Sequence, residues 1–189
     1  MPRKKRAAPR GRTRYAWHRR VPWFAIGGAA VVIVAVVFLA RSFGVGSPAV
    51  GRYVPGGAAL QHVPEGQAIA YPSYPPTGGP HWPSPTTWGA HTEAVPDELA
   101  VHNLEHGGVV ISYNNIPPAD LAAVRTLMQT YPRDQYNEVK VVLRPYDKIA
   151  PTTMTMTAWD WIDELPRYDD ARVRAFLQAH LNKCCEQVP

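Results

Sequence analysis

The stretch "GVVISYNNIPPADLAAVRTLMQTYP", residues 108 to 132, contains two different hydrophobic patterns in succession. Its first part is a short, mostly β-branched apolar run, which is typical of a buried strand. After two prolines the apolar side chains recur at helical spacing, and they are Leu121, Val124, Leu127, Met128 and Tyr131. The stretch therefore predicts a buried strand followed by an amphipathic helix.

The neighbouring segments extend this pair to a domain. Residues 97 to 106 begin after a proline and end at a double glycine, which predicts a short helix. Residues 138 to 145 are rich in valine, which predicts a strand. Residues 152 to 160 alternate strictly between two faces, which predicts a half-buried strand. Residues 169 to 183 predict a closing helix that starts at an aspartate. The order α-β-α-β-β-α predicts an α+β fold with a small mixed sheet. Its second half has the element order of a thioredoxin-like fold, although a C-x-x-C motif is absent.

Charge and hydropathy occupy separate blocks at the start of the chain. Residues 1 to 20 hold nine Lys and Arg and no acid, and residues 21 to 40 are uncharged. The uncharged length fits a bilayer core, which takes about 20 apolar helical residues. A positive flank stays in the cytoplasm, so we expect a transmembrane helix over residues 21 to 42 that contacts membrane lipid. A cleaved signal peptide is the alternative, but its apolar region usually has only about 7 to 15 residues.

This arrangement predicts a single-pass protein of the cell membrane with a cytoplasmic N-terminus and an extracytoplasmic domain. The basic tail then serves membrane topology and anionic lipid, and nucleic acid is not expected as a partner. Residues 43 to 70 are rich in Gly and Pro and predict a stalk. The domain is expected over residues 71 to 183, and it begins with an ordered, aromatic loop at residues 71 to 96 that contains seven prolines.

The helix before the double glycine carries the residues that could perform chemistry. His102 and His106 are four apart, so they share a helix face and could ligate one metal ion. With Glu105 they spell H-x-x-E-H, the inverted zinc-protease signature, in which the glutamate acts as general base. Hydrolysis would also need a third ligand and an open coordination position. The domain is small for such an enzyme with a substrate cleft, so the metallohydrolase stays an alternative.

A metal site without catalysis needs only that suitable ligands converge. His81 lies on the aromatic loop, and His62 and His91 are further candidates. Three imidazoles suit zinc or copper, and thioethers from Met154 and Met156 would favour copper. Two interpretations without a metal are the alternatives to this metal site. The histidines could brace the loop by hydrogen bonds, and the two methionines could fill the core.

Cys184 and Cys185 are the two cysteines of the chain, and they are adjacent. They cannot link distant segments, so a disulfide framework is excluded. Four readings stay open, which are a vicinal disulfide, soft-metal binding, covalent attachment to another group, and two free thiols in a C-terminal tail at residues 184 to 189.

Residues 71 to 114, "YPSYPPTGGPHWPSPTTWGAHTEAVPDELAVHNLEHGGVVISYN", resemble the bacterial Domain of Unknown Function 3105 family, and the resemblance extends over about residues 65 to 183. It implies a membrane anchor followed by one extracytoplasmic unit, and it implies no particular reaction. Gly78 stands where the family pattern has Ser, and Asp160 where it has Gly. The resemblance implies a shared site at His81, Trp88, His102, Asn103, Glu105, His106 and Gly107.

The function expected from these features is non-enzymatic: a membrane-anchored accessory or assembly subunit of a membrane protein complex that binds copper or zinc through His81, His102 and His106. The alternatives are a free-standing metallochaperone or metal sensor, and a small metallohydrolase that uses Glu105.

Overall fold

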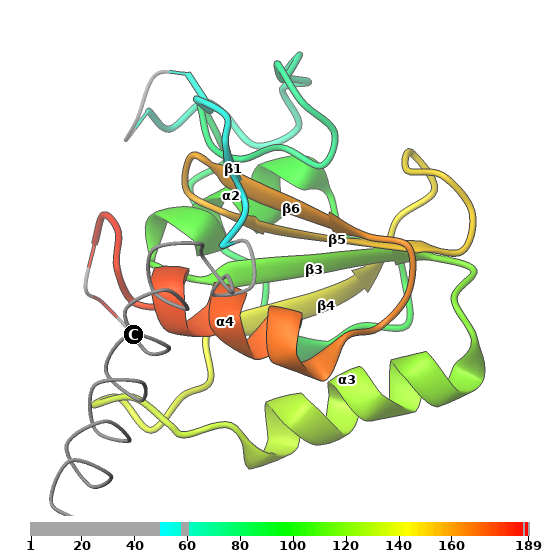
Figure 1. The fold of residues 1–189 in the computed structure, drawn as a ribbon. Helices are drawn as coiled ribbons and strands as arrows, with labels where there is room; N and C mark the ends of the chain where they lie inside the picture. Colours follow the sequence, from blue (N-terminus) through cyan, green and yellow to red (C-terminus); the bar gives the residue numbers. More distant parts are fainter. Residues whose placement is uncertain (1–49, 58–60, 187, 189) are drawn as a thin grey trace, which may run out of the picture. The chain divides into compact units, whose positions relative to one another are not determined.

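The computed structural model describes residues 50–57, 61–186 and 188, which form a mixed sheet with helices on both faces (Figure 1). The elements are β1 (Arg52–Tyr53), β2 (Gly89–Ala90), α2 (Asp97–Glu105), β3 (Val109–Asn114), α3 (Pro118–Thr130), β4 (Val141–Pro145), β5 (Thr153–Ala158), β6 (Trp161–Leu165) and α4 (Asp170–His180). The segment expected to cross the membrane, residues 21 to 42, lies outside the described residues. Within the described part of the chain, no helix has both the length and the apolar character needed for a membrane span.

The six strands of the sheet stand in the order β1-β6-β5-β3-β4-β2. β4 is parallel to both β3 and β2, whereas β5 runs antiparallel to β3 and β6, and β1 runs antiparallel to β6. The register places Ile111 at the centre of the sheet, beside Leu143 on β4 and Met156 on β5. A mixed sheet with helices packed on it confirms the α+β class.

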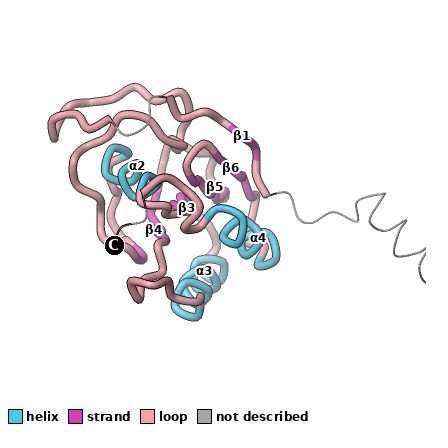
Figure 2. The backbone as a smooth tube through the Cα atoms, turned by 90° about the vertical axis from the view of Figure 1, so that its left-hand side faces the viewer, coloured by secondary structure: helices cyan, strands magenta, loops and turns pink. Residues whose placement is uncertain are grey.

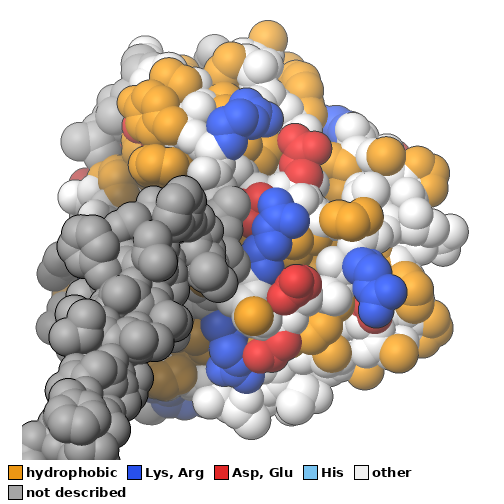
Figure 3. Space-filling view, viewed as in Figure 1, with side chains coloured by type: hydrophobic (Ala, Val, Ile, Leu, Met, Phe, Trp, Pro, Cys, Tyr) orange, Lys and Arg blue, Asp and Glu red, His pale blue; other side chains and the backbone are white. Residues whose placement is uncertain are grey.

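Alternation along the central strands separates two cores, one on each face of the sheet. On one face, Val109 and Ile111 pack with α3 and α4, whereas on the other Val110 and Val142 pack with α2. Figure 2 shows α3 and α4 on one side of the strands and α2 on the other. The face with α3 and α4 carries Lys and Arg side chains interspersed with acidic ones (Figure 3).

The predicted helices begin where the sequence indicated. Pro117 and Pro118 open α3, where the missing N–H of proline costs no helical hydrogen bond. The side chain of Asp169 caps α4 by accepting from the backbone N–H of Arg172 at 3.0 Å. Asp97 to Glu105 form α2, and His106 stands between its last residue and the double glycine.

The structure differs from the sequence prediction in the order of its elements and in the burial of one strand. The order α-β-α-β-β-α lacked β1, β2 and β6, of which β1 and β2 have only two residues each. β6 was hidden because its sequence, "WIDEL", follows β5 without a Gly or Pro signal. Asp160 makes that turn with φ 62°, at the position where the family pattern has glycine, and its carboxylate accepts from the N–H of Gly56 at 2.7 Å. β5 is not half-buried, since Thr155 and Thr157 are buried like Met154 and Met156.

Candidate metal site

Helix α2 and the turn after it supply three side chains of the site. His102 and Glu105 are buried, and His106 follows the last helical residue. Their positions one turn apart place them on one side of the helix. The N-terminus of α2 is fixed by Asp97, whose buried carboxylate accepts from the guanidinium of Arg144 on β4 at 2.8 Å. This ion pair holds the helix, and hence the site, against the sheet.

Two further histidines come from segments before the helix. His81, on the proline-rich loop, has a fully buried side chain. His62 lies beside it, because the backbones of residues 61 to 63 and His81 pair as an isolated bridge, with N–H to O distances of 2.8 and 3.0 Å. The segment expected to be a stalk therefore contributes both β1 and one histidine to the domain.

Four of these five side chains, all but that of His106, converge on one point. One potential ligand atom from each of His62, His81, His102 and Glu105 lies within 4.8 Å of the other three. Glu105 Oε2 is 2.9 Å from Nε2 of His81 and 3.6 Å from Nε2 of His62. The His81 and Glu105 side chains are almost inaccessible, whereas His62 is half exposed. The cluster therefore has a buried interior and one side open to solvent.

Backbone carbonyls fix the orientation of two of the rings. Nδ1 of His81 lies 2.8 Å from the carbonyl oxygen of Gly79, and Nδ1 of His102 lies 2.7 Å from that of Trp82. A carbonyl oxygen only accepts, so each Nδ1 carries the proton and donates it. In the neutral rings, Nε2 then holds a lone pair. Metal-ligating histidines usually donate their second ring N–H in this way, which fixes both tautomer and direction.

Electrostatics favour the neutral form of His102. Burial lowers the pKa of His102 below its ordinary value of 6.5, because desolvation disfavours the imidazolium. The neighbouring His106 and His81 also lower this pKa, while the hydrogen bond to the Trp82 carbonyl and the charge of Glu105 oppose the shift. A neutral imidazole is the form that binds metal ions.

The contact between His81 and Glu105 needs a cation or an extra proton. Both ring nitrogens of His81 face oxygen acceptors, but a neutral imidazole has only one N–H. Either this pair holds one more proton, or a metal ion joins Nε2 to the carboxylate. In addition, Glu105 Oε1 is buried without a hydrogen-bond partner among the described residues. Buried polar atoms are nearly always satisfied, so this oxygen is available to a cation or to an ordered water.

Other residues of the family pattern hold the cluster together. Asn103 pairs with the backbone of Thr86 through two hydrogen bonds of 2.9 Å, which ties the proline-rich loop to α2. Gly107 has φ 76°, and a Cβ there would lie 2.6 Å from the carbonyl oxygen of Cys184. A Cβ at Gly108 would meet the Trp88 ring at 2.6 Å. The double glycine thus lets two segments approach the end of the helix.

The C-terminal segment forms the wall next to His106. Cys184 and Cys185 form a disulfide with each other. The backbone carbonyl of Glu105 accepts from the N–H of Glu186 at 3.0 Å, and the Glu186 carboxylate lies 3.9 Å from Nε2 of His106. Glu105, His106 and Glu186 form a second group whose ligand atoms lie within 4.8 Å of one another. No local pattern points to Glu186, which is 80 residues from His106 along the chain.

The structure does not bring every candidate to this cluster. Met154 and Met156 are fully buried in the core beneath α3 and α4, on the face of the sheet opposite α2. His91 instead places Nε2 2.9 Å from the carbonyl oxygen of Thr87. His62 belongs to the site, but no local spacing relates it to the helix.

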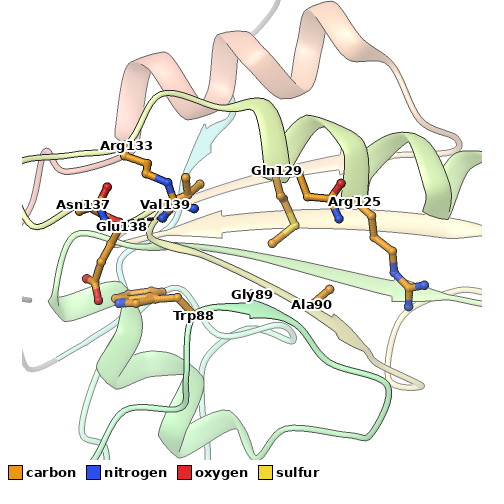
Figure 4. A pocket seen from close by; sticks show the side chains of 10 residues that line it. Trp88, Gly89, Ala90, Arg125, Gln129, Arg133, Asn137, Glu138 and Val139 are labelled. Atoms are coloured by element: carbon orange, nitrogen blue, oxygen red, sulfur yellow. Dashed lines mark hydrogen bonds between the residues drawn. The ribbon is translucent and has the colours of Figure 1, made fainter.

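Trp88 of the family pattern lines a separate pocket of about 500 Å³ between β2 and α3. Figure 4 shows Glu138 beside the Trp88 ring and Arg125 toward the other end of the pocket, beyond Ala90. None of the residues that line this pocket belongs to the histidine cluster. Trp88 therefore lies outside the histidine cluster, and its ring packs behind Gly108 and against the core around α2.

Comparison with known proteins agrees with the motifs. A family model described as Protein of unknown function (DUF3105) matches residues 62 to 188, which include the histidine cluster and Glu186. Neither a curated protein nor a solved structure matches the chain. The match confirms the family resemblance of the loop and helix motifs.

Proposed function

The chain belongs to the family described as Protein of unknown function (DUF3105), and from its site we propose that it is a metal-binding protein. The ligands are His62, His81, His102 and Glu105, and the preferred ion is zinc. The domain acts outside the cytoplasm, on a single membrane anchor, as a non-enzymatic accessory or assembly subunit of a membrane protein complex.

One observation carries the metal proposal: the Nδ1–H groups of His81 and His102 both point at backbone carbonyls of the same loop. Bracing alone would be served by any hydrogen bond, and it would not require Nε2 of His81 to face a buried carboxylate at 2.9 Å. A metal ion satisfies the Nε2 lone pairs and the carboxylate at the same time.

The ligand set favours zinc over copper(I). Three imidazoles and a carboxylate suit zinc, which is usually tetrahedral with ligand bonds of about 2.0 to 2.2 Å. Such bonds place neighbouring ligand atoms roughly 3.3 Å apart. The separations of 2.9 and 3.6 Å around Glu105 Oε2 bracket that value. Soft thioether ligands, which would select copper(I), lie on the other face of the sheet.

The extracytoplasmic membrane location rests on two features. The uncharged run at residues 21 to 40, with nine basic residues before it, has the length and the charge asymmetry of an anchor with a cytoplasmic N-terminus. The Cys184–Cys185 disulfide is of a kind that persists in oxidising compartments.

Two alternatives have specific support. A metallochaperone or sensor gains from the half-exposed His62, which offers a route for the ion to enter and leave. A metallohydrolase would use Glu105 as general base, but a base must be free of the ion it serves. Its 2.9 Å contact with Nε2 of His81 instead suits a ligand role.

Metal analysis of the full chain, extracted in mild detergent, tests the proposal. We expect bound zinc in the wild-type chain and its loss in His81→Gln combined with His102→Gln. His91→Gln is the matched control, since that histidine lies outside the cluster, and it should keep the metal. Zinc at 100 times its Kd should add about 2.7 kcal/mol to the unfolding free energy of the wild type and of His91→Gln, and nothing to that of the double variant. A folded wild-type chain that binds no offered metal would refute the site.

The remaining parts of the proposal have separate tests. An accessory subunit co-purifies with a membrane complex in mild detergent, and a chain that migrates alone contradicts that role. For the hydrolase alternative, Glu105→Gln would remove an activity and keep the metal. For the proposed ligand role, the same change weakens metal binding.

A further inference from the structure

We infer that the site has a second metal position beside the first, formed by Glu105, His106 and Glu186, so that the Glu105 carboxylate bridges two ions. This inference rests on the proposed zinc site, because Glu105 is the residue that both positions share. It adds a ligand from the C-terminal segment and a stoichiometry of two.

The first observation in favour of a second metal position is that three possible ligands lie close together. Ligand atoms of Glu105, His106 and Glu186 lie within 4.8 Å of one another, and Glu105 also belongs to the group with His62, His81 and His102. The ions of two-metal sites lie about 3.5 to 4 Å apart, a distance that one carboxylate spans with its two oxygens. Two overlapping groups with a shared carboxylate therefore have the composition of a dinuclear site.

The second support is the distribution of contacts on Glu105. Its Oε2 atom serves the first position, at 2.9 Å from His81. Its Oε1 atom is buried and has no hydrogen-bond partner within the described part of the chain. An ion bound through Oε2 alone would leave Oε1 unsatisfied, whereas a second ion would bind it. The Glu105 side chain is only 2% exposed, so bulk water does not hydrogen-bond to Oε1.

The third support comes from the two helical histidines. Nε2 of His102 lies 3.0 Å from Nε2 of His106. Because Nδ1 of His102 donates to Trp82, Nε2 of His102 accepts, and His106 supplies the proton between them. A neutral ring keeps one N–H, so Nε2 of His106 can bind a metal once its proton has moved to Nδ1. The two nitrogens then bind neighbouring ions, His102 in the first position and His106 in the second.

The backbone holds Glu186 at this place. Both Cys185 and Glu186 direct their N–H groups at the carbonyl oxygen of Glu105, at 3.4 and 3.0 Å. The N–H of Asn182 donates to the carbonyl of Gly107 at 2.7 Å. The buried ammonium of Lys140 donates to the carbonyls of His106 and Val188. The C-terminal segment is thus attached to the turn that carries His106.

Zinc titration of the full chain in mild detergent, followed by metal analysis after removal of weakly bound ions, tests this inference. We expect two zinc ions per chain in the wild type, one in Glu186→Gln, and two in Glu93→Gln. Glu93 is the matched control, because it is an exposed glutamate outside both groups. With two equivalents of copper(II), electron paramagnetic resonance should show coupled spins in the wild type and an isolated copper signal in Glu186→Gln.

The outcomes separate the two proposals. One zinc ion in the wild type, unchanged in Glu186→Gln, overturns the second position and leaves the first intact. One ion that is lost in Glu186→Gln also overturns it, since Glu186 would then belong to a single site. A wild-type chain that binds no zinc refutes both. Circular dichroism of each variant shows whether the fold is kept, and uncoupled spins in a wild type with two coppers contradict the bridge.

Discussion

Replacement of Asp97 by Asn should destabilise the domain more than removal of a charge on the surface would. The carboxylate accepts from the Arg144 guanidinium at 2.8 Å, the Tyr146 hydroxyl at 3.0 Å and the Lys148 ammonium at 2.9 Å. Arg144 is 1% exposed and Asp97 4%, so water cannot replace the lost partner. The neutral amide would leave a buried guanidinium without its counter-charge.

The magnitude follows from that burial. Removal of one partner of a buried ion pair costs about 3 to 5 kcal/mol. Asn keeps one acceptor oxygen, and the half-exposed Lys148 contributes little, so we expect the lower end, about 3 kcal/mol. For a protein of this size, that loss lowers Tm by roughly 6 to 12 °C. Metal affinity should fall as well, because Asp97 anchors the helix that carries His102 and Glu105.

Thermal and urea unfolding of the full chain, followed by near-ultraviolet circular dichroism, measure the effect. Glu164→Gln is the matched control, since it removes the same charge from an ion pair with Arg52 whose side chains are 68% and 67% exposed. That change should cost less than about 1 kcal/mol. Equal destabilisation by Asp97→Asn and Glu164→Gln would refute the argument that burial of the pair fixes the helix.

Three other changes follow from the same structure. Gly107→Ala should lower the unfolding free energy by about 1 to 3 kcal/mol, because φ is 76° and the new Cβ would meet the Cys184 carbonyl. Urea unfolding measures this loss, and an unchanged stability would contradict the close approach of the two segments. Burial raises the pKa of Tyr146 above its ordinary value of 10.0, so its phenol stabilises the fold below pH 10 and this contribution is lost as the pH rises further. The unfolding free energy should thus decline above pH 10, and it should decline less in Tyr146→Phe; equal declines would oppose this account. Met154→Leu with Met156→Leu should leave the metal content unchanged, and each change should lower the unfolding free energy by less than about 1.5 kcal/mol. Loss of metal would instead show that the thioethers are ligands.

Much of the fold could be predicted because its signals are local. Helical spacing from Leu121 to Tyr131, the prolines before α3 and the aspartate that caps α4 act within a few residues of one another. The missing strands lacked such signals. β1 and β2 are too short for a period to appear, and β6 follows a turn made by Asp160 instead of glycine.

The candidate site was predictable only in part, for the same reason. His102 and His106 are related by helix geometry, so their proximity is visible in the sequence. His81 could be proposed as a ligand, but its buried contact with Glu105 spans 24 residues and depends on the course of the loop. The methionines alternate as ligands on a strand would, and only the packing of α3 and α4 shows that their face is core.

The sequence by itself determined the family, the α+β class and the residue types at the site, because motif letters, periodicity and capping depend on neighbours along the chain. The tertiary structure decided which histidines meet, that Glu105 faces them from within the protein, and that Glu186 lies against His106. The residues that meet come from segments spread over 124 residues of the chain, from His62 to Glu186. Their proximity results from the packing of a loop and the C-terminal segment around one helix, which no local pattern encodes.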